Sequence, residues 1–171
     1  VFPAKTMCAH VTTWNKNSSV KFRTDVAMMC KLGFDIKLAD MSKDDEVYCR
    51  AAVQNYNRLK SVVLEGDMYR LVSPYANNHT STMYVAKNKG KAVVFAFDIH
   101  PRYAEKPLPV RMQGLDANQM YRVKEINLMP GFNSSLSGND EVFSGEFLMN
   151  VGLNIFTTQQ LNSRVIEVVA E

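Results

Sequence analysis

The apolar residues of this sequence change their spacing at Gly66, and that change limits the possible folds more than any other feature. Five apolar residues before Gly66 recur at helical spacing: Tyr48, Ala52, Tyr56, Leu59 and Val63. After Gly66 come short runs of β-branched and aromatic residues, separated by Asn, Gly and Pro. The sequence therefore predicts helices with short strands first, and an antiparallel sheet afterwards.

The segment before Gly66 predicts the order strand, helix, strand, helix. Residues 5–11 are strand-like, and Ser19 stands where it can cap a helix. We expect that helix to stop at Gly33 and to bury an apolar stripe made of Phe22, Val26, Met29 and Cys30. Residues 33–40, GFDIKLAD, are then predicted to form the second strand.

The second helix is predicted to begin after Ser42 and to end at Gly66. Asp45 occupies the capping-box position, and the first turn is acidic. Alternating strands and helices are typical of parallel α/β folds, but two such units can neither close a barrel nor cover a sheet on both faces. We therefore expect residues 1–65 to be part of a larger α/β structure.

The segment after Gly66 predicts about six antiparallel strands, in a sandwich or a partial barrel. The residues 86–92, AKNKGKA, are typical of a tight hairpin in which Gly90 can adopt a positive φ. The predicted strands cover residues 67–73, 82–87, 91–99, 109–114, 121–128 and 163–169.

Charge and composition exclude several classes of partner. The net charge is +3, from 20 Lys and Arg against 17 Asp and Glu, and the basic residues are scattered, which argues against nucleic-acid binding. No apolar run reaches the roughly eighteen residues of a membrane span, and no signal peptide is recognisable. The compartment stays open between cytoplasm and periplasm. Cys8, Cys30 and Cys49 are expected to be reduced, packed thiols.

The sequence predicts neither a metal site nor a cofactor. The pair Cys8 and His10 supplies too few ligands for zinc, and we expect His10 to lie satisfied inside a strand. His79 and His100 fall on different segments, and we expect no acidic cluster beside either of them. Among the acidic residues, Asp40 stands where a strand passes into its loop.

Several stretches together resemble the last third of family 36 glycoside hydrolases, the bacterial α-galactosidases. They are FPAKTMCAHVTTWN, KFRTDVAMMCKLGFDI, YNRLKSVVLEGDMYRLVSP, FSGEFLMNVGL and SRVIEV, in this order. The resemblance implies that residues 1–65 are the last two βα units of a (β/α)8 barrel and that residues 66–171 form a sandwich-like antiparallel C-terminal β domain. Cys8 departs from the glycine that the family usually has at this position.

The resemblance also implies a retaining hydrolase whose two catalytic aspartates lie on barrel strands before residue 1. No catalytic residue is therefore expected in this chain. Thr12, Trp14, Asn15 and Asp40 would lie at the catalytic face of the barrel, and in the intact enzyme they are candidates for a rim that binds a galactosyl oligosaccharide. Packing for Trp14 and a structural role for Asp40 are the alternatives.

A second hypothesis is a non-catalytic β module that acts alone in carbohydrate binding or assembly. Such a module would leave the apolar stripes of both helices without a barrel to cover them, among them Phe22, Met29, Tyr56 and Leu59. We therefore expect self-association through these helices, a rearrangement of about the first 40 residues, or pairing with an upstream barrel region, because a partial barrel has open parallel edges.

Overall fold

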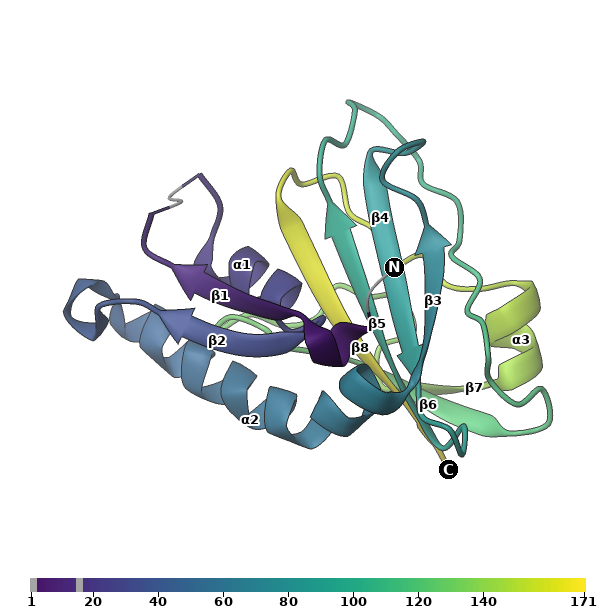
Figure 1. The fold of residues 1–171 in the computed structure, drawn as a ribbon. Coiled ribbons are helices and arrows are strands. Elements are labelled where there is room, and N and C mark those ends of the chain that lie inside the picture. The colour runs from purple at the N-terminus through teal and green to yellow at the C-terminus, as the bar shows by residue number, and fades with distance from the viewer. Residues whose placement is uncertain (1–2, 15–16) are drawn as a thin grey trace.

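The computed structural model describes residues 3–14 and 17–171. An α/β segment comes first, with two parallel strands, β1 (Cys8–Thr12) and β2 (Lys31–Asp35), and two helices, α1 (Val20–Ala27) and α2 (Lys43–Glu65). Two 3-10 turns, η1 (Ala4–Thr6) and η2 (Leu38–Asp40), precede β1 and α2 (Figure 1). The predicted order of strand, helix, strand, helix is confirmed.

The remaining strands form one six-stranded antiparallel sheet, in the order β3-β4-β5-β8-β6-β7. The predicted antiparallel C-terminal part is therefore confirmed, and its strands belong to one continuous sheet. A short helix, α3 (Gly145–Asn150), follows the last edge strand. The strands are β3 (Asp67–Val72), β4 (His79–Val85), β5 (Lys91–Asp98), β6 (Met120–Ile126), β7 (Glu141–Ser144) and β8 (Asn162–Ala170).

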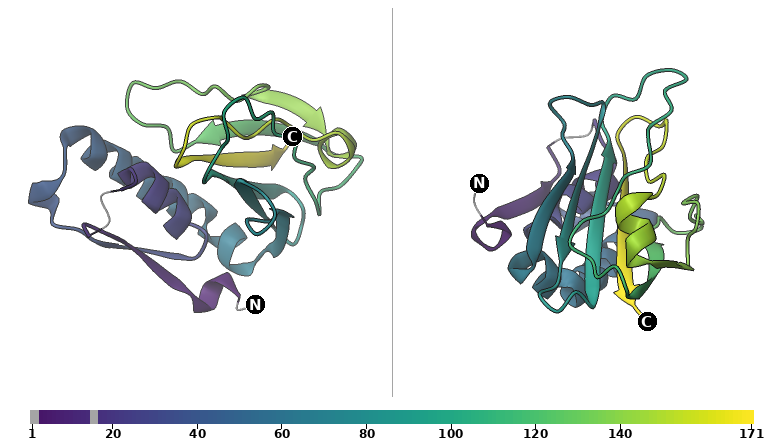
Figure 2. Two further views of the ribbon diagram at one scale, coloured as in Figure 1. Left: turned by 90° about the horizontal axis from the view of Figure 1, so that it is seen from above. Right: turned by 90° about the vertical axis from the view of Figure 1, so that its right-hand side faces the viewer.

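Helices α1 and α2 lie between the β1–β2 pair and the six-stranded sheet (Figures 1 and 2). One hydrophobic core joins all three layers, including Val11 of β1, Leu59 of α2 and Phe95 of β5. The predicted stripe of α2 is buried, and Phe22 of α1 packs edge-on against Phe97 at 5.6 Å between ring centroids. The expectation that the helix stripes lack a cover is therefore wrong, because the chain's own sheet covers them.

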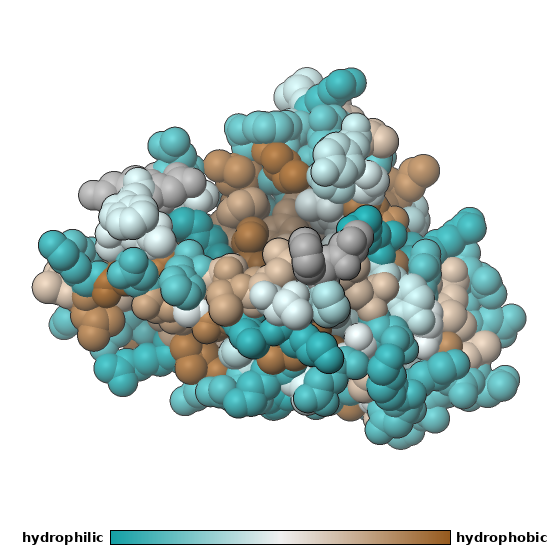
Figure 3. Space-filling view, viewed as in Figure 1, coloured by the Kyte–Doolittle hydropathy of each residue, from teal (hydrophilic) through white to brown (hydrophobic). Residues whose placement is uncertain are grey.

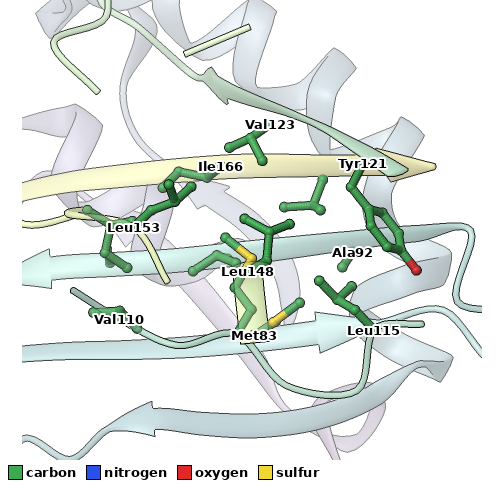
Figure 4. Packing of buried hydrophobic residues seen from close by; sticks show 14 of the residues in the cluster. Met83, Ala92, Val110, Leu115, Tyr121, Val123, Leu148, Leu153 and Ile166 are labelled. Carbon is green, nitrogen blue, oxygen red and sulfur yellow. The ribbon is translucent and has the colours of Figure 1, made fainter. Parts of the chain in front are cut away.

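The opposite face of the six-stranded sheet has a second hydrophobic core. Loops and helix α3 cover this face, and in Figure 4 the side chain of Leu148 points into a layer that includes Met83, Ala92 and Ile166. The central strands β5 and β8 therefore have buried side chains on both faces.

Helix α2 begins and ends where its sequence signals stand. The Oγ atom of Ser42 accepts a hydrogen bond from the backbone N–H of Asp45 at 3.1 Å, which satisfies a free donor of the first turn. Gly66 follows the last turn, and a Cβ atom there would lie 2.3 Å from the carbonyl oxygen of Val62 and 2.5 Å from that of Val85. Only glycine permits this close approach of the helix end to β4.

Helix α1 is shorter than predicted, and its stripe is only partly as predicted: Cys30 is buried, and Phe22 and Met29 pack against the core. Ser19 caps it as expected, through a 3.1 Å bond from the N–H of Phe22. The helix ends at Ala27, and Gly33 lies inside β2 instead of stopping the helix. The buried face includes Thr24 and Asp25, whereas Val26 is 37% exposed, because a core polar network and not an apolar stripe orients this helix.

Two further local predictions were wrong, and two short elements were not predicted. In the β4–β5 hairpin the positive φ falls on Lys89, at 58°, and not on Gly90. Residues 109–114 form no strand and contribute only the isolated bridge between Val110 and Leu153. Strand β7 and helix α3 lie in a region that was not assigned, because each is too short to show a period.

Asp25 is the centre of a buried polar network that connects the helices to the sheet. Its carboxylate accepts hydrogen bonds from Lys21 Nζ at 2.6 Å, Tyr48 Oη at 2.8 Å, Asn127 Nδ2 at 3.0 Å and Ser163 Oγ at 2.7 Å. Burial raises the pKa of the Tyr48 phenol, and the neighbouring carboxylate raises it further. The network fixes α1 against both α2 and β8.

Candidate functional site

One face of the β1–β2 pair is uncovered. Parallel pairing places partners of equal register on the same face, which here carries Cys8, His10, Thr12, Lys31, Gly33 and Asp35, and we call it the open strand face. Most of these side chains are exposed, whereas Val11 on the opposite face packs against the helices. Within the described residues, β1 and β2 pair only with each other, so each has one unpaired edge. Figure 3 shows apolar residues in the centre of this side of the molecule.

His10 lies on the open strand face, and the prediction of a satisfied interior histidine was wrong. Its ring lies over Gly33, where an added Cβ atom would be 2.5 Å from the ring. Gly33 therefore leaves the space that the imidazole occupies.

The cysteines have different surroundings. Cys8 is exposed, which contradicts the prediction of a packed thiol. Cys30 is buried and Cys49 is partly buried. Burial raises the pKa of the Cys30 thiol and raises that of Cys49 to about 11, so both are protonated at neutral pH.

Two of the predicted rim residues come together at the carboxyl ends of β1 and β2. Thr12 and Asp40 line one hollow of about 270 Å³, which we call the rim hollow. Arg23 of α1 lines it too and donates a hydrogen bond to the carbonyl oxygen of Thr12, which ties the end of β1 to the helix. Asp45, in the first turn of α2, also faces this hollow.

Of the other two predicted rim residues, Trp14 does not line this hollow. Trp14 is 84% exposed, so the alternative of packing within this chain is wrong for it. Asn15 lies outside the described residues. The rim hollow thus offers a backbone-linked guanidinium, two threonines and two carboxylates, a set that can hydrogen-bond a polar ligand.

Sequence reasoning gave Asp45 only a role at the start of its helix and did not single out Arg23.

His79 has acidic neighbours, contrary to the prediction. Its Nδ1 lies 2.7 Å from Asp98 Oδ1, and its Nε2 lies 3.6 Å from Glu105 Oε2. The pKa of Glu105 is lowered, mainly by a hydrogen bond from the backbone N–H of Arg102. Across residues 3–14 and 17–171, no three His, Cys, Asp or Glu side chains stand close enough together to hold a metal ion. In the same part of the chain, no helix has the length and apolar character needed to cross a membrane.

Comparison with known proteins covers nearly the whole chain. The profile described as "Melibiase" matches residues 1–66, and that of the "Glycosyl hydrolase family 36 C-terminal domain" matches residues 79–168. Alpha-galactosidase 2 of Hypocrea jecorina is 30% identical over 97% of this chain and 21% of its own length. Alpha-galactosidase AgaA of Geobacillus stearothermophilus is 28% identical over 77% of this chain and 19% of its own length. The chain spans about a fifth of the length of these curated relatives.

Solved structures give the same assignment. The GH36 alpha-galactosidase AgaB from Geobacillus stearothermophilus superposes on 99% of this chain with a TM-score of 0.82 and 26% identity, and the match covers 22% of that protein. A variant of AgaA from the same organism, crystallised with raffinose, gives a TM-score of 0.82 at 25% identity over 99% of this chain and 22% of its own. The profile of the C-terminal domain covers more than half of the sequence, and the fold agrees along its length. This chain belongs to glycosyl hydrolase family 36, and it corresponds to the C-terminal portion of the related enzymes.

Proposed function

We propose that the chain is the C-terminal portion of an α-galactosidase that hydrolyses terminal α-linked galactose with retention of configuration. The observation that carries the proposal is the order of the two family matches, 1–66 and then 79–168, on one continuous fold. We assign residues 1–65 to the last two βα units of the catalytic barrel and residues 66–171 to the C-terminal β domain. The names of the relatives support the substrate class, and related enzymes have been crystallised with raffinose and with stachyose.

Retaining hydrolysis requires a nucleophilic carboxylate and an acid/base carboxyl group about 5 Å apart. The nucleophile attacks the anomeric carbon while the acid protonates the leaving oxygen, and water then releases the sugar. In this proposal both groups come from barrel strands outside the 171 residues. The unpaired edges of β1 and β2 and the open strand face support this, because a barrel interior and two further strands would cover them.

The role of this chain at the active site is to form part of the substrate rim. Active sites of (β/α)8 barrels lie at the carboxyl ends of the strands, where the rim hollow lies. We propose that Asp40 accepts hydrogen bonds from sugar hydroxyls, that Thr12 and Asn15 contribute further polar contacts, and that exposed Trp14 stacks on the apolar side of a pyranose ring.

Hydrolysis of a chromogenic α-galactoside tests the proposal. The chain alone is compared with the same chain extended by the coding sequence that precedes it in its gene, and proton NMR of the released sugar identifies the anomer. We expect activity only in the extended protein, with α-galactose as the first product. Activity of the isolated chain would refute the assignment of the carboxylates, and an inactive but folded extended protein would refute the α-galactosidase assignment.

The alternative of a self-sufficient carbohydrate-binding module has one observation in its favour. The sheet covers the helix stripes, with Tyr56 and Leu59 buried, so the chain contains a core that joins its two parts. A folded chain that binds saccharide, together with an inactive extended protein, is the result this alternative predicts.

A further inference from the structure

A second hollow lies between the start of α1 and the loops of the C-terminal part. Its volume is about 740 Å³, within the range of small-molecule sites. Three segments build it: residues 17–21, the connection from β6 to β7, and the segment 157–164 that leads into β8. We call it the junction hollow. It shares no lining residue with the rim hollow.

The charged side chains at the junction hollow already have partners within the protein. Lys21 Nζ bonds Asp25 at 2.6 Å and the carbonyl oxygen of Ser163 at 2.8 Å. Arg164 lies 3.4 Å from Glu125, and its Nη1 donates to the carbonyl oxygen of Ile155 at 3.1 Å. Since these charges are paired and mostly buried, the hollow presents little free charge to a ligand.

Neutral polar groups and one aromatic ring remain available. Ser18, Asn133 and Gln159 line the hollow, and in residues 3–14 and 17–171 their side chains form no hydrogen bond with other protein groups. Phe132, on the same wall, is 72% exposed. Hydroxyl and amide groups can both donate to and accept from sugar hydroxyls, and an aromatic face packs against the C–H side of a pyranose.

Hydrogen bonds within the protein hold the wall segments of the junction hollow in place. Ser134 Oγ donates to Glu125 Oε2 at 2.5 Å, and Arg164 Nη2 donates to Ser135 Oγ at 2.5 Å, so buried charges hold the β6–β7 connection in place. On the other wall Asn162 Nδ2 donates to Thr157 Oγ1 at 3.1 Å. A braced site loses less conformational freedom when it binds a ligand.

We propose that the junction hollow is a binding site for a neutral saccharide, separate from the substrate rim. The class of ligand follows from unpaired neutral hydrogen-bonding groups, an exposed aromatic ring and internally neutralised charges. Among the described residues a phosphate or a uronic acid would find no free cation here, and an apolar peptide would bury the free amides without partners. Binding at this site does not require that the protein hydrolyses the saccharide.

Saturation-transfer difference NMR tests this site, because it reads the protons of the sugar and tolerates an oligomeric protein. The unmodified 171-residue chain is mixed with raffinose, and inorganic phosphate is then added as a competitor. We expect saturation transfer with a dissociation constant on the order of millimolar, unaffected by phosphate. No transfer, or displacement by phosphate, would overturn the proposal.

Variants locate the site. We expect Phe132→Ala to weaken raffinose binding roughly two- to tenfold and Gln159→Ala to weaken it as well. The matched control is Phe147→Ala, which removes a partly exposed ring from α3, away from the junction hollow, and should leave binding unchanged. Full binding by both Phe132→Ala and Gln159→Ala, or loss of binding in Phe147→Ala, would contradict the site, and circular dichroism checks that each variant is folded.

Discussion

Replacement of Asp25 should destabilise the protein more than any surface change, because its carboxylate connects α1 with α2, with β8 and with the segment after β6. The carboxylate is completely buried and accepts hydrogen bonds from Lys21, Tyr48, Asn127 and Ser163. Asp25→Ala removes the acceptor of Ser163 Oγ and the closest acceptor of the Tyr48 phenol. Asn127 Nδ2 keeps only its contact with Met28 Sδ. The ammonium of Lys21, whose side chain is only 13% exposed, loses its counter-charge. Helix α1 then loses its carboxylate bonds to α2 and β8 and keeps the bond from Lys21 Nζ to the carbonyl oxygen of Ser163.

The magnitude follows from the burial of the groups left behind. Removing one partner of a buried ion pair costs about 3–5 kcal/mol, and each unsatisfied buried donor costs about 1–3 kcal/mol. The terms are not additive because they share one site, so we expect Asp25→Ala to lower the free energy of unfolding by about 3–5 kcal/mol. A domain whose total stability is about 5–15 kcal/mol would lose a large fraction of it.

Urea unfolding followed by circular dichroism measures this loss. The matched control is Glu46→Ala, which removes an exposed ion pair with Arg50, with side chains 49% and 75% exposed, and should cost about 0.5 kcal/mol. In the double variant Lys21→Met with Asp25→Asn, neither charge remains, and we expect it to be more stable than the sum of the two single losses predicts, by about 1–3 kcal/mol. A loss below about 1 kcal/mol in Asp25→Ala would refute the reasoning.

Three further expectations concern pH, close packing and association. Burial raises the pKa of Tyr84 from 10.0 to about 12. The stability that the protonated phenol contributes is therefore present below pH 10 and is lost as pH rises toward the folded pKa. Tyr84→Phe should reduce this alkaline loss in the free energy of unfolding by about 2–3 kcal/mol, as urea unfolding at pH values across this range can measure. Gly145→Ala would place a Cβ atom 1.9 Å from the carbonyl oxygen of Asp116, and it should lower the free energy of unfolding by about 1–3 kcal/mol. In the control Gly90→Ala the nearest atom to the new Cβ would lie at 3.4 Å, and the free energy of unfolding should change by no more than about 0.5 kcal/mol. Thermal unfolding of both variants checks this expectation. The isolated chain should self-associate through the unpaired edges of β1 and β2. Cys8→Lys places a charge at an exposed position of β1 and should reduce the mass measured by light scattering. A monomeric unmodified chain would contradict this expectation.

The second helix was the most predictable element, and the first helix the least. In α2 the cap at Ser42, the apolar stripe and Gly66 all indicate the same 23-residue helix, and the structure agrees. In α1 the predicted stripe includes Val26, which is exposed, and leaves out Asp25, which is buried and bonds Ser163, 138 residues away in the sequence. No local pattern encodes such a partner, so periodicity did not predict the burial of Asp25.

The candidate site was predictable only in its placement. The rule that barrel strands present function at their carboxyl ends brought Thr12 and Asp40 together, as the rim hollow has them. Arg23 was missed because its role depends on a long side chain that reaches back over the first turn of its helix. The contact between His79 and Asp98 was within reach of the sequence: in the antiparallel β4–β5 hairpin, both residues lie the same distance from the turn.

The two buried faces of the central sheet alter what keeps its strands aligned. In most antiparallel sheets one face is exposed, so sliding a strand by one residue would expose its apolar side chains to water, and this cost favours the native register. The cost is small for β5, because nearly every position of this strand is buried on one face or the other. Its alignment is instead encoded by volume: Ala92, Val94 and Ala96 face α3, while Val93, Phe95 and Phe97 face the long helices. A slipped strand would drive two phenyl rings into alanine-sized spaces, so steric exclusion selects the native pairing.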